Sequence, residues 1–304
     1  MHIVIAGGTG LLGRALARAA LAAGHRITIL SRRPRHPHAV HWPAAEGDRA
    51  WWRVVDGCDA VVNLAGAPIA ERRWTAARKE EIRRSRIDST RAIVAAIRAV
   101  ERPPAVLLNA SAIGIYGPRG DEAVTEETPP GRDFLADVCQ EWERAALEAA
   151  APRPGSAHGT RVVLLRTGLV LDRHGGALPR LALPFRFCAG GPLGSGQQYM
   201  SWIHRDDWTA LVMSAMLAPG LAGAINLTAP SPVRNAEMAR TLGRVLRRPS
   251  FVRTPAFALR LALGEMADAM ILTGQRVLPA RAQAHGFAFR FPELEAALRD
   301  LYSE

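Results

Sequence analysis

The chain has 304 residues, 48% of them hydrophobic and 22% charged, so it can bury a large core and can divide into two lobes. No uncharged apolar run of about eighteen residues occurs, which predicts no membrane-spanning helix, and the first expected strand starts too early for a signal peptide. The formal charge of +11 is spread along the chain and is carried almost entirely by arginine, so we predict no nucleic-acid partner.

The N-terminal stretch has the order strand, turn, helix, strand. Residues 3–6 are apolar and mostly β-branched, as in a strand buried on both faces, and an Ala- and Leu-rich helix ends at Gly24 before a second strand at 27–30. Between the first strand and the helix lies a glycine-rich turn of the kind that holds a diphosphate at a helix N-terminus. We predict cofactor contacts from Gly7, Thr9, Gly10, Leu11, Leu12 and Gly13.

The residues after the second strand indicate which dinucleotide binds. A site specific for NAD places an acidic residue there for the ribose 2′-hydroxyl, but this chain has Ser31, Arg32 and Arg33. A guanidinium suits a 2′-phosphate, so Ser31 and Arg32 predict that NADP(H) is preferred over NAD(H). The alternative is a solvated basic turn in an arginine-rich protein.

Further strands and helices alternate along the chain. We expect a short helix at 51–57, a strand at 59–64, a long helix at 75–100, a strand at 105–109, a helix at 133–150, a linker at 152–159 and a strand at 162–166. The third strand ends in small residues that let the chain lie close to a ligand, and Thr167 follows the fifth. These positions add Asn63, Leu64, Ala65, Gly66 and Thr167 to the predicted cofactor site.

Strand–helix alternation predicts an α/β fold, a Rossmann-type doubly wound parallel sheet with a smaller mixed, mostly helical C-terminal lobe. The regular pattern stops near residue 172, where Gly and Pro become frequent, and a last core strand is expected at 224–227. We therefore assign residues 1–171 and 203–228 to an NADP-binding domain, and 172–202 and 229–304 to the lobe. Asp206 or Asp207 is the expected N-cap of the helix that follows His204.

Several segments together resemble the extended short-chain dehydrogenase/reductase superfamily, which includes sugar-nucleotide epimerases and dehydratases. They are residues 7–13, 63–66, the Ser-Ala-Ile-Gly-Ile-Tyr-Gly loop at 111–117, and 202–207. An epimerase-like family with a C-terminal domain of unknown function is similar at Ser-Arg-Ile 85–87, Asp-Phe-Leu-Ala 133–136, Gly-Ser-Gly 194–196, Ser-Trp-Ile-His 201–204 and 277–301. The resemblance covers nearly the whole chain and implies the Rossmann fold.

The resemblance also implies a Tyr-x-x-x-Lys pair that moves a proton, with a serine that positions the substrate oxygen. That pair is absent: the only lysine is Lys79, which follows Thr75 at the required spacing. The usual place of the tyrosine falls in the apolar stretch 134–139. Ser111 and the cofactor turn are what remain of the superfamily's site.

Three other side chains are candidates for the missing proton chemistry. Tyr116 could act as the acid, with Arg119 or another arginine supplying positive charge, although it could equally line the pocket. His204 titrates near neutrality and could be an acid or base, or it could fix a strand-to-helix junction. Cys139 lacks an obvious base and reads as a core residue. With Cys58 and Cys188 it shows no metal-ligand spacing, so we predict no metal site.

These features lead to two hypotheses. In the first, the chain is an NADP(H)-binding epimerase-like oxidoreductase of a nucleotide-sugar or another small polar carbonyl or hydroxyl compound, with Ser111 and Tyr116 as catalytic residues. In the second, it is a catalytically degenerate NADP(H)-binding sensor or scaffold. We predict a cytoplasmic protein that can form a homodimer, with no membrane partner. Predicted substrate contacts are Trp74, Arg86, Ser201 and His204, with Arg73, Gln198 and Trp202 as further candidates.

Overall fold

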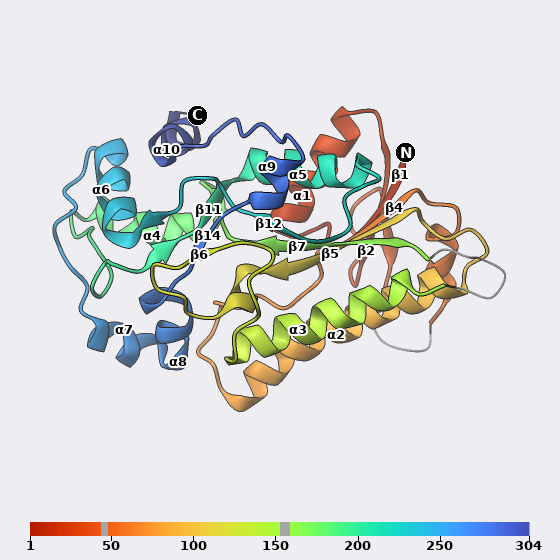
Figure 1. Cartoon of the computed structure of the whole chain (residues 1–304), viewed down its shortest axis with the longest axis horizontal. Coiled ribbons are helices and arrows are strands. Elements are labelled where there is room, and N and C mark those ends of the chain that lie inside the picture. Colours follow the sequence, from red (N-terminus) through yellow and green to blue (C-terminus); the bar gives the residue numbers. More distant parts are fainter. Residues whose placement is uncertain (44–47, 153–158, 304) are drawn as a thin grey trace.

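The computed structural model describes residues 1–43, 48–152 and 159–303. A seven-stranded parallel sheet crosses the molecule, in the order β12-β7-β5-β4-β1-β2-β3 (Figure 1). The order reverses direction at β1, as in a doubly wound fold, which confirms the predicted fold class. The strands are β1 (His2–Ala6), β2 (Arg26–Ser31), β3 (Ala39–His41), β4 (Ala60–Asn63), β5 (Val106–Ala112), β7 (Arg161–Thr167) and β12 (Gly223–Leu227).

Helices cover both faces of this sheet, so successive strand residues enter different cores. On β1, Ile3 and Ile5 pack in the core that includes residues of α1 (Leu11–Ala22) and α5 (Arg205–Leu217). Val4 packs in the opposite core, which includes residues of α2 (Ala76–Ala99) and α3 (Phe134–Leu147). Burial on both faces explains why these strands read as continuous apolar runs.

The two long helices of the second face begin at side-chain caps. Thr75 Oγ1 accepts from the Arg78 N–H at 3.1 Å before α2, and Asp133 Oδ1 accepts from the Ala136 N–H at 2.9 Å before α3. Each cap satisfies an N–H group that has no partner inside the helix. α2 and α3 then lie side by side along the sheet (Figure 1).

The second half of the chain adds a lobe with its own core. A three-stranded sheet joins β11 (Trp202–His204), β8 (Leu169–Asp172) and β9 (Gly175–Gly176), and β10 (Tyr199–Met200) pairs with β13 (Val233–Arg234). Its helices gather toward the left of Figure 1, apart from α9, which lies above the sheet. They are α4 (Leu178–Arg186), α6 (Asn235–Leu246), α7 (Ala256–Leu263), α8 (Glu265–Ala267), α9 (Ala280–Ala284) and α10 (Leu294–Ser303).

The lobe is also paired with the loop that follows β5. The short strand β6 (Ala123–Val124) in that loop runs parallel to β14 (Arg276–Val277), and the Leu278 N–H donates to Val124 O at 2.8 Å. The residue split between domain and lobe stays a prediction. β8 begins inside the range 1–171 but pairs with β11 rather than with the main sheet.

Four local expectations need correction or comment. β5 continues to Ala112, so Ser111 lies on a strand and not in a loop. Residues 172–202 are not irregular throughout, because they contain α4. The helix expected at 51–57 is a short 3-10 turn, Ala50–Val54. Most of the linker predicted at 152–159 lies outside the described residues. Within the described ranges, no helix is both long enough and apolar enough to cross a membrane.

Candidate functional site

The carboxyl ends of the parallel strands meet at one edge of the sheet. In the strand register Ala6 is opposite Asn63, Asn63 is opposite Asn109, and Ser111 is opposite Arg166. Open α/β sheets bind ligands at this edge, at the point where the strand order reverses. The structure thus brings the glycine turn after β1, the loop after β4 and the serine of β5 to the same edge.

The glycine turn is tight because two backbones approach each other there. Gly7 has φ +76°, and a Cβ added to it would lie 2.7 Å from the backbone C and O of Leu64. A Cβ on Gly13 would lie 2.3 Å from Gly7 O, so α1 packs directly on the turn. Gly10 is the N-cap of α1 and supplies no side-chain hydrogen bond to the first N–H groups. This glycine cradle at a helix N-terminus fits a dinucleotide diphosphate.

A buried amide network holds the loop after β4. Asn63 Nδ2 donates to Asn109 Oδ1 at 2.7 Å and to Thr90 Oγ1 at 2.8 Å, and Asn63 Oδ1 accepts from the Ala65 N–H at 3.2 Å. Trp142 Nε1 donates to the same Thr90 hydroxyl at 2.8 Å. Asn63 is fully buried, so it positions residues 64–66 and does not face the edge of the sheet itself.

The basic turn after β2 is at the surface. Arg32 is exposed, and its side chain makes no hydrogen bond or ion pair with the residues that the structure describes. Ser31 Oγ instead accepts from the Arg33 N–H at 3.2 Å, which shapes the turn. A guanidinium without a carboxylate partner remains available for a phosphate.

Ser111 is hydrogen-bonded to a carboxylate. Its Oγ donates to Glu143 Oε1 at 2.6 Å, and Arg166 donates to both oxygens of that carboxylate, from Nε and from Nη2, at 2.9 Å each. Ser111 and Glu143 are only 4% and 6% exposed. Although burial opposes it, the ion pair with Glu143 keeps the pKa of Arg166 above its usual range. Ser111 thus donates to a carboxyl group that is held on its other side by two hydrogen bonds from a guanidinium.

Tyr116 supports the same arginine from its other side. The phenol donates to Asn226 Oδ1 at 2.7 Å and accepts from Arg166 Nη1 at 2.9 Å. Burial raises the pKa of Tyr116, although Arg166 and Asn226 oppose the shift. The side chain is 0% exposed, so its hydroxyl has no path to a substrate. Arg119, the arginine named as a possible partner, donates to the Tyr116 backbone carbonyl instead, at 3.0 Å.

Arg86 lies beside the loop after β4 and next to Cys139. Its side chain is the nearest group to Gly66, and its guanidinium is 5.3 Å from the Trp142 ring centroid. Its only hydrogen bond with the described residues goes to Ile82 O at 2.9 Å. Burial lowers the pKa of Arg86, and it raises the pKa of Cys139 to about 12, which keeps the thiol neutral. Cys139 is thus a core residue.

The other predicted contacts are buried or half-buried. Ser201 Oγ donates to Gln275 O at 2.7 Å and accepts from the Val277 N–H at 2.9 Å, so it anchors β14. Thr167 Oγ1 accepts from Trp208 Nε1 at 3.2 Å. Trp202 is fully buried in the core of the lobe. Trp74 is half-buried and packs edge-on against Phe134.

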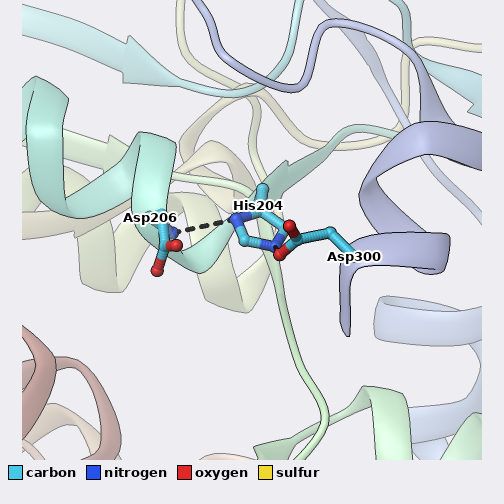
Figure 2. Close-up of side chains that lie close together, drawn as sticks. All are labelled: His204, Asp206 and Asp300. Carbon is cyan, nitrogen blue, oxygen red and sulfur yellow. Dashed lines mark hydrogen bonds and ion pairs between the residues drawn. The ribbon is translucent and has the colours of Figure 1, made fainter. Parts of the chain in front are cut away.

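His204 forms a structural joint instead of a substrate contact, and it also corrects the predicted cap of α5. Its Nδ1 accepts from the Asp206 N–H at 3.1 Å, so His204 and neither aspartate is the N-cap (Figure 2). Nε2 lies 3.3 Å from Asp300 Oδ2, on α10, and the ring packs on Phe291. The side chain is 0% exposed. The Asp207 carboxylate accepts from the backbone N–H groups of Arg290 and Phe291, both at 2.9 Å.

The same three side chains have the composition of a metal site, because ligand atoms of His204, Asp206 and Asp300 lie within 4.8 Å of one another. The hydrogen bond from the Asp206 N–H decides against it. An imidazole that accepts at Nδ1 in its neutral form carries its proton on Nε2, which then has no lone pair for a metal. The cluster is a cap of α5 and a polar contact between α5 and α10.

Two cavities are lined by residues of the loops and the lobe. One, of about 590 Å³, lies between the loop after Tyr116 and the lobe, and the buried Gln198 Oε1 in its wall has no hydrogen-bond partner among the described residues. It is lined by Pro118, Gly120, Asp121, Gln197, Gln198, Arg234, Leu272, Thr273 and Gly274. The second, of about 430 Å³, is lined by Arg72, Arg73, Thr75, Ala77, Arg78 and Glu81.

Sequence reasoning missed Glu143, Arg166 and Asn226. A glutamate on an amphipathic helix reads as solvated, and nothing local shows that it faces a strand. Arg166 did carry a signal, because a charged residue near the end of a strand buried on both faces needs a partner. Asn226 occupies the same kind of position on β12.

Comparisons with known proteins agree with this arrangement. The family model described as the NAD dependent epimerase/dehydratase family matches residues 3–227, and a domain of unknown function matches residues 254–301. Epimerase family protein SDR39U1 homolog, chloroplastic, of Arabidopsis thaliana is 42% identical over 98% of this chain and 86% of its own length.

Two solved structures have the same fold along the whole chain. Human epimerase family protein SDR39U1 (isoform 2) with NADPH has a TM-score of 0.89 and 36% identity, covering 100% of this chain and 99% of that one. The nucleoside-diphosphate sugar epimerase from Corynebacterium glutamicum has a TM-score of 0.81 and 33% identity, covering 100% of this chain and 59% of that one.

Proposed function

The chain belongs to the NAD-dependent epimerase/dehydratase family, and on this premise we propose that it is an NADP(H)-dependent oxidoreductase of a small polar carbonyl or hydroxyl compound. The observation that carries the proposal is the placement of Ser111. Its hydroxyl lies at the carboxyl end of β5, at the same edge as the glycine cradle after β1, and it has a carboxylate 2.6 Å behind it. A bound dinucleotide and a substrate oxygen can meet there.

The cofactor proposed is NADP(H) in preference to NAD(H). Exposed Arg32, without a carboxylate partner among the described residues, supports this preference, because a guanidinium binds a 2′-phosphate through charge-assisted hydrogen bonds. The similar human structure is named as a complex with NADPH, which points the same way. Residues 7–13 would hold the diphosphate, and residues 64–66 would lie beside the bound dinucleotide. Ser31 would shape the turn that binds the ribose.

The proposed chemistry assigns separate tasks to the residues of the site. When bound, NADP(H) supplies or accepts a hydride. Ser111 holds the reacting substrate oxygen, and the Glu143–Arg166 pair fixes the direction of its hydroxyl. Arg86, half-buried beside Gly66 without a carboxylate partner among the described residues, would bind a polar or anionic part of the substrate.

A nucleotide-sugar is the substrate class that we place first. The cavity of about 590 Å³ is large enough for a remote group of such a compound, and the unpartnered Gln198 Oε1 in its wall would accept a hydrogen bond from it. Trp74, at the start of α2, would contact the same ligand. The roles of Ser201 and His204 in this proposal are limited to supporting the fold, as their contacts indicate.

The test is a calorimetric titration with NADPH and with NADH, on the natural chain and on Arg32→Ala. We expect NADPH to bind more tightly, and the mutation to weaken NADPH by about 10-fold to 100-fold, the loss typical of hydrogen bonds to a charged group, while NADH changes little. A screen of ketones, aldehydes and nucleotide-linked sugars follows. Absence of binding by either nucleotide would contradict the proposal.

A second candidate function is an NADP(H) sensor or scaffold without turnover. Its supporting observation is that neither Tyr116 nor Cys139 presents a titratable group to the site. This candidate requires tight NADPH binding, no turnover of any compound in the screen, and a protein partner whose capture depends on NADPH. Turnover of one substrate class decides against it.

The same proposal covers the location of the protein and its partners. We place the protein in the cytoplasm and propose that it can form a homodimer, with no nucleic-acid partner. The formal charge of +11 is distributed over the chain, and many arginines of α2 pair with glutamates at its surface, as Arg84 does with Glu80. Light scattering on the purified protein measures its oligomeric state directly.

A further inference from the structure

Tyr116, Cys139 and His204 are not available to donate or accept a proton at the site. The phenol of Tyr116 is fully buried and engaged on both sides. The Cys139 thiol is buried and neutral. His204 caps α5 at its contact with α10. One titratable group remains in direct contact with Ser111, and that group is Glu143.

We propose that Ser111 and Glu143 form a proton relay that takes the place of the missing Tyr-x-x-x-Lys pair. This inference rests on the proposed function. Ser111 is the catalytic residue that touches the substrate oxygen, and Glu143 is a positioning residue that acts through it. Arg166 and Tyr116 hold Glu143 in place.

The direction of one hydrogen bond indicates which substrate the resting site fits. A serine hydroxyl has a single proton, and Ser111 donates it to Glu143 Oε1 at 2.6 Å. While that bond exists, Ser111 can only accept a hydrogen bond from a ligand. A substrate hydroxyl can supply that bond and a carbonyl cannot, so the site in this arrangement is complementary to an alcohol.

The relay balances in atoms and electrons. In the oxidising direction the substrate C–H bond breaks and its hydride passes to NADP⁺, while the O–H bond breaks and its proton passes to Ser111 Oγ. The original serine proton passes to Glu143, and the substrate carbonyl forms. The alcohol is oxidised by two electrons and NADP⁺ is reduced to NADPH. In the reducing direction protonated Glu143 returns its proton through Ser111 to the new alkoxide.

The Arg166 contacts explain why the carboxylate stays in place during this exchange. Arg166 donates from Nε and Nη2 to both Glu143 oxygens, and its Nη1 is held by the Tyr116 hydroxyl and by Glu126 O at 3.2 Å. Each guanidinium nitrogen therefore has an acceptor, so the arginine cannot turn away. Charge-assisted two-point pairing of this kind fixes the orientation of the carboxylate as well as its position.

Two side chains of α3 also keep the four-residue spacing of the superfamily's tyrosine–lysine pair. Cys139 and Glu143 are four residues apart on α3, as are the tyrosine and lysine that the resemblance led us to seek. One helix face therefore still presents two side chains toward the end of β5. The chemistry has changed, because a neutral thiol and a carboxylate now occupy those positions and the positive charge comes from Arg166 on β7.

The experiment uses four variants of the full chain and NADPH with 9,10-phenanthrenequinone as the probe carbonyl. Glu143→Gln removes the proton acceptor, Ser111→Ala removes the hydroxyl and leaves the Glu143–Arg166 pair intact, and Ser111→Thr keeps a hydroxyl. Glu141→Gln is the matched control, because Glu141 is on the same helix but pairs with Arg83 of α2. The measurements are NADPH affinity and turnover against pH.

We expect all four variants to bind NADPH within about twofold of the natural chain. Ser111→Ala and Glu143→Gln should lose turnover by about 100-fold or more, the usual contribution of general acid–base catalysis, and Ser111→Thr should recover part of the loss. Glu143→Gln should also change the dependence of turnover on pH, because the relay passes a proton through the Glu143 carboxyl group.

The outcomes separate the relay from the proposed function. A natural chain that binds NADPH but reduces neither the quinone nor any compound of the screen contradicts the proposed function, and the relay with it. Turnover that survives in Glu143→Gln with an unchanged pH profile overturns the relay alone. If Glu143→Gln does not fold, Ser111→Ala decides the question, since full turnover in that variant also overturns the relay.

Discussion

Glu143 and Arg166 meet through two hydrogen bonds of 2.9 Å each, one from Nε and one from Nη2, at the carboxyl end of β5 and β7. Their side chains are 8% and 12% exposed. An ion pair shielded in this way fixes a geometry, but it costs desolvation, and either charge left alone is strongly unfavourable. The pair thus links the stability of the site to its chemistry.

Arg166→Met should lower the free energy of unfolding by about 3–5 kcal/mol, because it leaves the Glu143 carboxylate buried and unpaired. The double variant with Glu143→Gln should recover part of this loss. Urea denaturation measures both. The control is Arg83→Met on α2, which breaks a more exposed pair with Glu141 and should cost at most about 1 kcal/mol. Equal losses in the two single variants would contradict this account.

Gly7→Ala and Gly24→Ala separate backbone strain from steric conflict, because both residues have φ +76°. A Cβ at Gly24 has nothing within 4 Å, so Gly24→Ala should cost about 1–2 kcal/mol for the left-handed conformation alone. A Cβ at Gly7 meets the Leu64 backbone at 2.7 Å, so Gly7→Ala should cost more and weaken NADPH at least about tenfold. Thermal unfolding and calorimetry test this, and a normal NADPH affinity in Gly7→Ala would refute the cradle.

The Tyr116→Phe variant tests whether the Tyr116 hydroxyl is a proton donor or only supports the structure. Removing the hydroxyl leaves Asn226 Oδ1 without its donor and removes an acceptor from Arg166 Nη1, so the protein should lose about 1–3 kcal/mol of stability. Because Tyr116 is fully buried, we expect the turnover of a substrate found in the screen to stay within about tenfold of the natural chain at low temperature. A loss of 100-fold or more with intact folding would restore Tyr116 as the proton donor.

Acid should destabilise the fold through the buried His204. Burial lowers the pKa of His204 below 6.5, although the nearby aspartates oppose the shift. The unfolded chain therefore binds more protons than the folded chain between the lowered pKa and 6.5, so stability falls as pH falls below 6.5. His204→Asn keeps an N-cap acceptor and should remove this part of the pH dependence. An unchanged profile in urea denaturation between pH 7 and 5 would contradict it.

The glycine cradle and the strand–helix order could be predicted because their signals are local. A β-branched run, a turn that needs φ above zero and an Ala-rich helix lie within about thirty consecutive residues, the length of one such unit. Arg32 at the end of β2 follows from the same unit. Each of these features depends on neighbours in the sequence and needs no knowledge of distant contacts.

The Ser111–Glu143–Arg166 arrangement could not be predicted, because it joins two strands and a helix that are separate in sequence. Nothing near Glu143 distinguishes it from Glu141, which faces Arg83 instead. The cap of α5 was missed for another reason. Asp206 is the commoner residue type at an N-cap, and only the fold shows that His204 already accepts the Asp206 N–H.

The pairing of β6 with β14 has a consequence for how the chain can be divided. The matched segment 254–301 contributes β14 to a strand near residue 124, gives the N–H of Arg281 to Glu126, and closes over Asp207 with two further N–H groups. Cutting the chain before residue 254 would remove these backbone partners from Glu126 and Asp207. The segment is thus an inseparable part of one folding unit, and a fragment that ends at residue 253 should be recovered only as aggregate.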